Sequence, residues 1–128
     1  MGFHYYNYSI WVEKDADFSM EKLKNILENV DFLKKPDVSI QLQNKKITIV
    51  LGNYHIWLPF MQDSFVEQEA QESSERHPCL KNCNARIDMY AEDDPDEKFY
   101  NQQLILVETI GNLKGTHIYD PYLGEWMN

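Results

Sequence analysis

The feature that most constrains the fold is a pair of alternating segments between residues 38 and 51. Apolar side chains occupy every second position of residues 38–43, and the same period returns in residues 47–51 after the polar pair Asn44-Lys45. Because successive side chains of a strand point to opposite faces, this pattern predicts two strands joined by a tight turn. The alternate positions of the first segment are polar, so one face of the sheet meets water. This favours an antiparallel sheet over a parallel sheet buried on both faces.

Four further segments predict strands. They are residues 3–12, which are rich in aromatic and β-branched types, and residues 54–58, 85–91 and 116–119. The strand at 54–58 is expected to stop at Pro59, because proline has no N–H to give to a ladder. With two or three strands between the first helix and the acidic segment, we expect an antiparallel sheet of about five strands.

An amphipathic helix is predicted from Ser19 onward. Met20, Leu23 and Leu27 recur at steps of three and four residues, which places them on one face of a helix. Pro36 prevents the helix from continuing past the lysine before it.

A second helix is expected to begin at Pro95, with Asp94 as its N-cap. Proline is tolerated at the first helical position, and Glu97 falls three residues after the cap, as in a capping box. Apolar residues then follow a helical period as far as Leu113. A strand remains the alternative at residues 104–107, which form a short apolar run.

Residues 61–83 differ from the rest, because they are acidic and hold few large apolar side chains. We expect a solvated helix or loop there, connecting the hairpin region to the strand at 85–91. The chain then forms a single domain, residues 1–128, of the α+β class. With two main helices on one face of the sheet, the order of elements fits a split βαβ, ferredoxin-like plan.

The net charge of −9 lies in the second half of the chain, where residues 61–128 hold fourteen acids against five bases. Such a chain repels a phosphate backbone, which disfavours direct binding to nucleic acid. An acidic field attracts a basic protein partner, but it also aids solubility, so both explanations stay open. No apolar run approaches the roughly 18 residues of a membrane helix and the N-terminus lacks a secretory pattern, so we expect a cytoplasmic protein without a membrane partner.

Two groups of residues carry metal-ligand chemistry. Carboxylates crowd residues 88–97, where a divalent cation would bind if several converged, although helix capping accounts for part of them. His77, Cys79 and Cys83 offer three zinc ligands, but no second cysteine pair completes a structural site. The glycine motifs of nucleotide-binding and acyl-transfer enzymes do not occur in the sequence. We therefore expect no catalytic residue, metal or cofactor, and keep a small metal-dependent or thiol enzyme as an alternative.

Aromatic side chains are the remaining signal, since three tryptophans and eight tyrosines exceed what the core of so short a chain requires. Tyr119, Tyr122 and Trp126 follow the last predicted helix and lie beside Asp120 and Glu125. Tyrosine and tryptophan dominate the hot spots of protein interfaces, so this tail is a candidate contact surface. Its partner is a foreign protein or, in a homo-oligomeric adaptor domain, a second copy of the chain.

Two short motifs stand out in this small acidic chain: the strand end Tyr90-Ala91-Glu92-Asp93-Asp94-Pro95 and the tail Ile118-Tyr119-Asp120-Pro121. With the profile of the whole chain, they resemble bacterial immunity proteins, which neutralise polymorphic or contact-dependent toxins. The resemblance implies a protein that binds a cognate toxin, such as a basic nuclease-type domain whose cleft carboxylates fill as phosphate mimics. The candidate partner-binding residues are Asp88, Tyr90, Glu92, Asp93, Tyr119, Asp120, Tyr122, Glu125 and Trp126.

Overall fold

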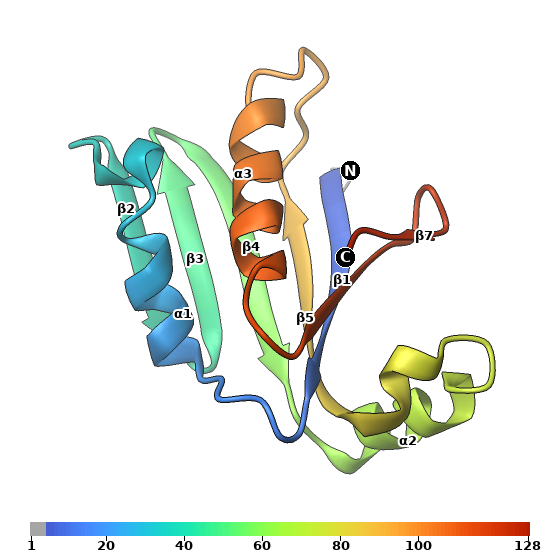
Figure 1. Ribbon diagram of the computed structural model, residues 1–128. Helices are drawn as coiled ribbons and strands as arrows, with labels where there is room; N and C mark the ends of the chain where they lie inside the picture. The colour runs from blue at the N-terminus through green and yellow to red at the C-terminus, as the bar shows by residue number, and fades with distance from the viewer. Residues whose placement is uncertain (1–4) are drawn as a thin grey trace.

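The structure is a computed structural model that describes residues 5–128, so the first two positions of the strand expected at 3–12 lie outside the described residues. Its strands form one antiparallel sheet in the order β2-β3-β4-β5-β1-β6-β7 (Figure 1). In chain order they are β1 (Tyr5–Glu13), β2 (Val38–Gln43), β3 (Lys46–Leu51), β4 (Tyr54–Met61), β5 (Cys83–Ala91), β6 (Thr116–Asp120) and β7 (Glu125–Trp126). The antiparallel sheet is confirmed, but the expected number of about five strands is too low. One reason is that the tail turns back and pairs with β6 as the short strand β7.

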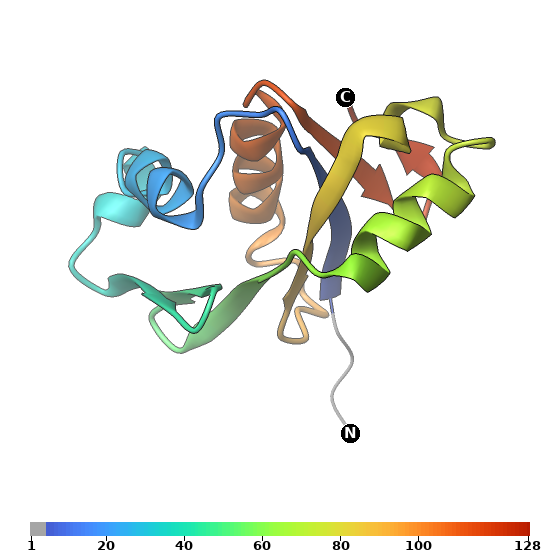
Figure 2. The ribbon, with the colours of Figure 1, turned by 90° about the horizontal axis from the view of Figure 1, so that it is seen from below.

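Helical segments cover both faces of this sheet. They are α1 (Met20–Leu27), η1 (Asp31–Lys34), α2 (Ser64–Ser73), η2 (Pro78–Asn82) and α3 (Tyr100–Gly111), where η marks a 3₁₀-helix. The helices α1 and α3 pack on one face, whereas α2 lies against the opposite face beside β5 (Figure 2). The α+β class is therefore confirmed. Among residues 5–128, no helix is long and apolar enough to cross a membrane.

Two separate cores hold these layers together. The main core lies between the sheet and the helices α1 and α3, and its fully buried side chains include Ile10, Leu23, Ile49, Ile87 and Leu106. A smaller core lies under α2 and consists of Trp11, Val66, Ala70, Leu80 and Cys83. The residues 61–83, expected to be a solvated helix or loop, thus contain the helices α2 and η2, which bury only Val66, Ala70 and Leu80.

The hairpin predicted from the alternating segments is present. β2 pairs with β3 in continuous register, and the two residues between them, Asn44 and Lys45, have φ angles of 53° and 61°. Two positive φ angles in succession are what a two-residue type I′ turn requires. On β3, Ile47, Ile49 and Leu51 face the main core, as the period of two predicts.

Two boundaries differ from the expectation. The helix α1 ends at Leu27, and a 3₁₀-helix covers the last residues before Pro36. The expected stop at Pro59 is wrong, because β4 continues to Met61. Pairing between β4 and β5 is recorded at Trp57 and Phe60 but not at the two positions between them. The missing N–H of proline therefore interrupts one ladder without ending the strand.

The expected start of the last helix at Pro95 is also wrong, because α3 begins at Tyr100. Glu97 has a φ of 55°, which no right-handed helix accommodates, so it does not form a capping box. Asp94 is 4% exposed and accepts hydrogen bonds from the backbone N–H groups of Lys98 (2.9 Å) and Phe99 (2.8 Å). The carboxylate thus holds a turn that precedes the helix. The strand considered at 104–107 is absent, since these residues belong to α3.

Candidate partner-binding face

The sheet face opposite α1 and α3 is only partly covered, by α2, and we call it the open face. On β5 the side chains of Ile87 and Met89 enter the main core, so those of Asp88 and Tyr90 point the other way. On β6 the buried Ile118 likewise sends Tyr119 to the open face. The half-buried residues of this face include Ser9, His55, Trp57, Arg86, Asp88, Tyr90, His117, Tyr119 and Trp126.

One row of residues runs across four neighbouring strands of the open face. Ser9 of β1 pairs with Asp88 on one side and with Tyr119 on the other, and Tyr119 pairs with Trp126 of β7. Directly paired residues of antiparallel strands share a face. The structure therefore brings together three of the candidate residues, Asp88, Tyr119 and Trp126, which lie far apart in the sequence.

Trp126 belongs to a compact aromatic group rather than to a free tail. Its ring centroid lies 5.0 Å from that of Tyr119 and 5.2 Å from that of His77, and the rings are steeply inclined. The indole Nε1 donates a hydrogen bond of 3.0 Å to His77 Nδ1. His77 follows α2, so this contact fixes the tail to a distant part of the chain. No local pattern in the sequence predicts this contact.

A second aromatic group lies on the β4 side of the open face. The ring centroids of His55 and Trp57 are 5.5 Å apart, and those of Trp57 and Tyr90 are 5.0 Å apart, with both pairs stacked. Glu92 closes this group, because its carboxylate accepts the backbone N–H of His55 (2.8 Å) and contacts the imidazole Nδ1. Trp57 was not a candidate residue, although its place between the buried Ile56 and Leu58 marks it for this face.

Ion pairs occupy the space between the two aromatic groups. Arg86 donates to Glu69 of α2 (2.8 Å), and its Nε lies 2.8 Å from Asp88 Oδ1 without the angle of a hydrogen bond. The guanidinium also lies over the ring of Trp11, 5.0 Å from its centroid. Burial lowers the pKa of Arg86, but the two carboxylates more than offset this and raise it above its ordinary value. Asp88 is thus partly neutralised within the chain.

A shallow groove of about 570 Å³ runs along this ion-pair group. Its walls include Ser9, Asp88 and Tyr90 of the sheet and Glu69 of α2. Farther along the face, His117 Nε2 lies 2.6 Å from Glu13 Oε2, which gives another carboxylate an internal partner. The open face therefore combines two fixed aromatic groups with carboxylates that are already paired.

The other candidate residues lie away from the open face. Asp120 was expected on the contact surface, but it is 8% exposed and lies on the helix side of the sheet, because it shares a face with Ile118. Asp93 is exposed just beyond β5, and Glu125 and Tyr122 are exposed in the β6–β7 hairpin, with Tyr122 91% exposed. Only these last three fit the expectation of free surface groups.

The groups considered for metal binding do not converge. Among residues 5–128, no three histidine, cysteine, aspartate or glutamate side chains form a group that could hold a metal ion. His77 accepts the Trp126 hydrogen bond, and the Cys83 thiol donates to the carbonyl of Cys79 (3.5 Å). Burial, together with the charges of Cys79 and Glu13, raises the pKa of Cys83 to about 12. Such a thiol holds little thiolate at neutral pH, which disfavours it as a nucleophile.

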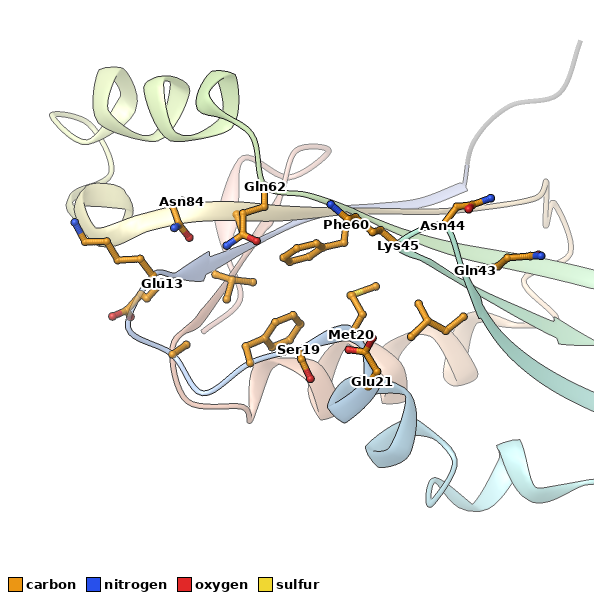
Figure 3. A pocket seen from close by; sticks show the side chains of 16 residues that line it. Glu13, Ser19, Met20, Glu21, Gln43, Asn44, Lys45, Phe60, Gln62 and Asn84 are labelled. Carbon is orange, nitrogen blue, oxygen red and sulfur yellow. The ribbon is translucent and has the colours of Figure 1, made fainter.

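A cleft of about 530 Å³ lies between the start of α1 and the β2–β3 turn. Figure 3 shows Phe60, Met20 and Ser19 around it, with Lys45 and Glu13 toward its rim. Its charged lining residues are two glutamates and two lysines, so it favours a ligand of neither sign. None of the candidate partner-binding residues lines it. The open face remains the better candidate site.

In comparisons with known proteins, no protein-family model, curated protein or solved structure matches this chain.

Proposed function

We propose that this chain is an immunity protein that binds a cognate bacterial toxin in the cytoplasm and neutralises it through the open face and the β6–β7 hairpin. The observation that carries the proposal is the pair of aromatic groups, one around Trp126 and one around Trp57, on a single sheet face. Strand pairing and ring stacking already order these side chains, so binding costs little side-chain entropy. Half-buried tyrosine and tryptophan rings are the anchors that protein interfaces use most.

Exposed carboxylates, rather than the carboxylates on the open face, support a basic partner. Asp88 and Glu92 have internal partners in Arg86 and His55, whereas Asp93 and Glu125 are exposed. Exposed carboxylates steer a basic toxin toward the face, and this raises the association rate. Asp88 sits beside the groove, where a cationic toxin side chain can compete with Arg86 for its carboxylate.

The order of the central strands of the sheet also supports the proposal. The strands β4, β5, β1 and β6 are neighbours in this order, with α1 and α3 as the helices on one face. We propose that these elements form a split βαβ, ferredoxin-like unit, to which the β2–β3 hairpin, α2 and β7 are additions. The additions leave the open face of the central strands partly uncovered, as a binding protein requires.

Growth rescue tests the proposal. Toxin domains encoded in the same genome are expressed one at a time from an inducible promoter, in cells with and without this chain. We expect one toxin to be neutralised, and its purified domain to form a stoichiometric complex with the chain. Trp57→Ala and Trp126→Ala should each weaken that complex by about 30-fold or more, as the loss of an interface anchor does.

The control variant is Ile105→Ala, because Ile105 is a 42% exposed apolar residue of α3 on the other side of the sheet. Melting curves identify variants that fail to fold. Trp57→Ala keeps the measurement decisive if Trp126→Ala unfolds, since Trp126 also packs against the smaller core. Rescue of no toxin, or equal affinity of the Trp57→Ala and control variants, would contradict the proposal. A concentration-dependent mass without toxin binding would instead assign the open face to self-association.

A further inference from the structure

A second concave site lies on the helix-bearing side of the sheet, beside the first turn of α3. This cleft has a volume of about 670 Å³, within the range of small-molecule sites. Its defining residues are Tyr6, Tyr8, Tyr100, Gln103, Asp94 and Asp120, and we call it the tyrosine cleft. It shares none of its charged residues with the groove of the open face.

Gln103 is an unpartnered amide at this cleft. Its side chain is 0% exposed, and neither Nε2 nor Oε1 has a hydrogen-bond partner within residues 5–128. Buried polar atoms in native proteins are almost always hydrogen-bonded, so an amide in this state indicates a missing ligand. Gln103 lies near Tyr8, where burial and the charge of Asp120 raise the pKa of the Tyr8 hydroxyl and the amide only partly offsets this rise. Both Oε1 and Nε2 therefore retain their capacity to bond a ligand that enters the cleft.

The charge of the tyrosine cleft has one sign. Three carboxylates line it, Asp94, Glu97 and Asp120, and no lysine, arginine or histidine does. Asp94 uses both oxygens on hydrogen bonds from its own turn and from Tyr6. Asp120 differs, because its two bonds from backbone N–H groups, of 2.9 Å and 3.2 Å, both end on Oδ1. Its Oδ2 therefore retains the capacity to accept from a ligand.

The walls of the cleft are aromatic. The rings of Tyr6 and Tyr100 lie with centroids 6.4 Å apart and tilted by 53°. Tyr122 and Leu123 lie at the rim in the β6–β7 turn, and both are exposed. Faces of aromatic rings attract cations, and exposed apolar side chains at a rim suit the alkyl stem behind a cationic head.

We propose that the tyrosine cleft binds a guanidinium group on an alkyl chain, which donates to Asp120 Oδ2 and Gln103 Oε1 while lying between tyrosine rings. A guanidinium fits better than an ammonium, because it is planar, stacks on rings and offers several N–H donors in a fixed fork. The group belongs either to a small alkylguanidine or to an arginine side chain of a protein. This inference is independent of the proposed immunity function.

Titration calorimetry on the full chain tests the inference with four probes: n-butylguanidinium, its neutral planar analogue n-butylurea, n-pentylammonium, and N-acetyl-arginine N-methylamide. We expect saturable one-to-one binding of butylguanidinium, and binding of butylurea and pentylammonium weaker by about tenfold or more, since charge-assisted forked bonds are the strong ones. If the blocked arginine binds as tightly as butylguanidinium, the site takes an arginine side chain of a protein. If the blocked arginine does not bind while butylguanidinium does, the site takes a small molecule.

Asp120→Asn keeps an acceptor for the turn but removes the charge, so it should weaken butylguanidinium by about tenfold or more. Gln103→Leu is the second variant and should also weaken binding while leaving the turn intact. Asp88→Asn, in the groove of the open face, is the control and should bind as wild type does. Absent binding, equal binding of butylurea, or unaltered affinity in a folded Asp120→Asn or Gln103→Leu would overturn the inference. None of these results depends on a toxin, so they leave the test of the proposed function separate.

Discussion

Replacing Asp94 with alanine tests how the turn before α3 is held. The carboxylate is buried and accepts hydrogen bonds from Lys98 N, Phe99 N and the hydroxyl of Tyr6. A hydrogen bond to a charged group contributes about 1.5–3 kcal/mol, but water reaches part of this turn in the variant and the contributions are not additive. We therefore expect Asp94→Ala to lower the free energy of unfolding by about 3–4 kcal/mol, in the range of a broken buried network.

Urea unfolding followed by tryptophan fluorescence measures this change. Asp93→Ala is the matched control, because Asp93 is the exposed neighbour of Asp94 and should change stability by no more than about 0.5 kcal/mol. Tyr6→Phe removes one of the three bonds and should cost about 1–2 kcal/mol in the wild type, but close to nothing in the Asp94→Ala background. A cost of Asp94→Ala below about 1 kcal/mol, or an equal cost of Tyr6→Phe in both backgrounds, would refute the reasoning.

Three further predictions concern single groups. Burial and the adjacent carboxylate raise the pKa of Tyr6, so the unfolded chain ionises first near about pH 10, and stability should fall as pH rises above that value, more steeply in wild type than in Tyr6→Phe. Gly115 has a φ of 87°, and a Cβ there would lie 2.6 Å from the Cβ of Ala16. Gly115→Ala should therefore lower the urea midpoint far more than Gly124→Ala, whose φ is also positive but whose nearest contact would be 3.7 Å. Cys83, with its raised pKa, should react with a thiol reagent much more slowly in the native chain than in urea, and rapid native labelling would reopen the thiol-enzyme alternative.

Local patterns were enough for the hairpin but not for the start of α3. The hairpin depends on a period of two and on a turn pair that tolerates positive φ, and both are visible in a short stretch of sequence. The Asp94-Pro95 pair also looks like a local helix start, yet the carboxylate is held by Tyr6, which is 88 positions away. A contact of that separation is decided by the strand order, which no local pattern contains.

In the candidate site, too, some features follow from local patterns and others depend on the strand order. Strand register places three of the candidate residues, Asp88, Tyr119 and Trp126, in one row, although they lie far apart in the sequence. Asp120 lies on the opposite face from its neighbour Tyr119, because consecutive residues of a strand face opposite ways and Asp120 shares the face of the buried Ile118. The alternation along residues 116–120 is enough to assign these two neighbours to different faces from the sequence alone.

The internal ion pairs change what the acidic charge of the chain can do. Arg86 lies 2.8 Å from both Glu69 and Asp88, so these three charges together contribute only one net negative charge to the field at a distance. The rest of the long-range field originates in exposed acids outside the centre of the open face, such as Asp93, Glu125 and the exposed glutamates of α2, which we call the rim. Salt screens exposed charges strongly and half-buried pairs weakly. For a basic partner, association rate should thus depend on salt through the rim, while dissociation rate depends on the aromatic groups and on whether the partner's cation displaces Arg86 from Asp88.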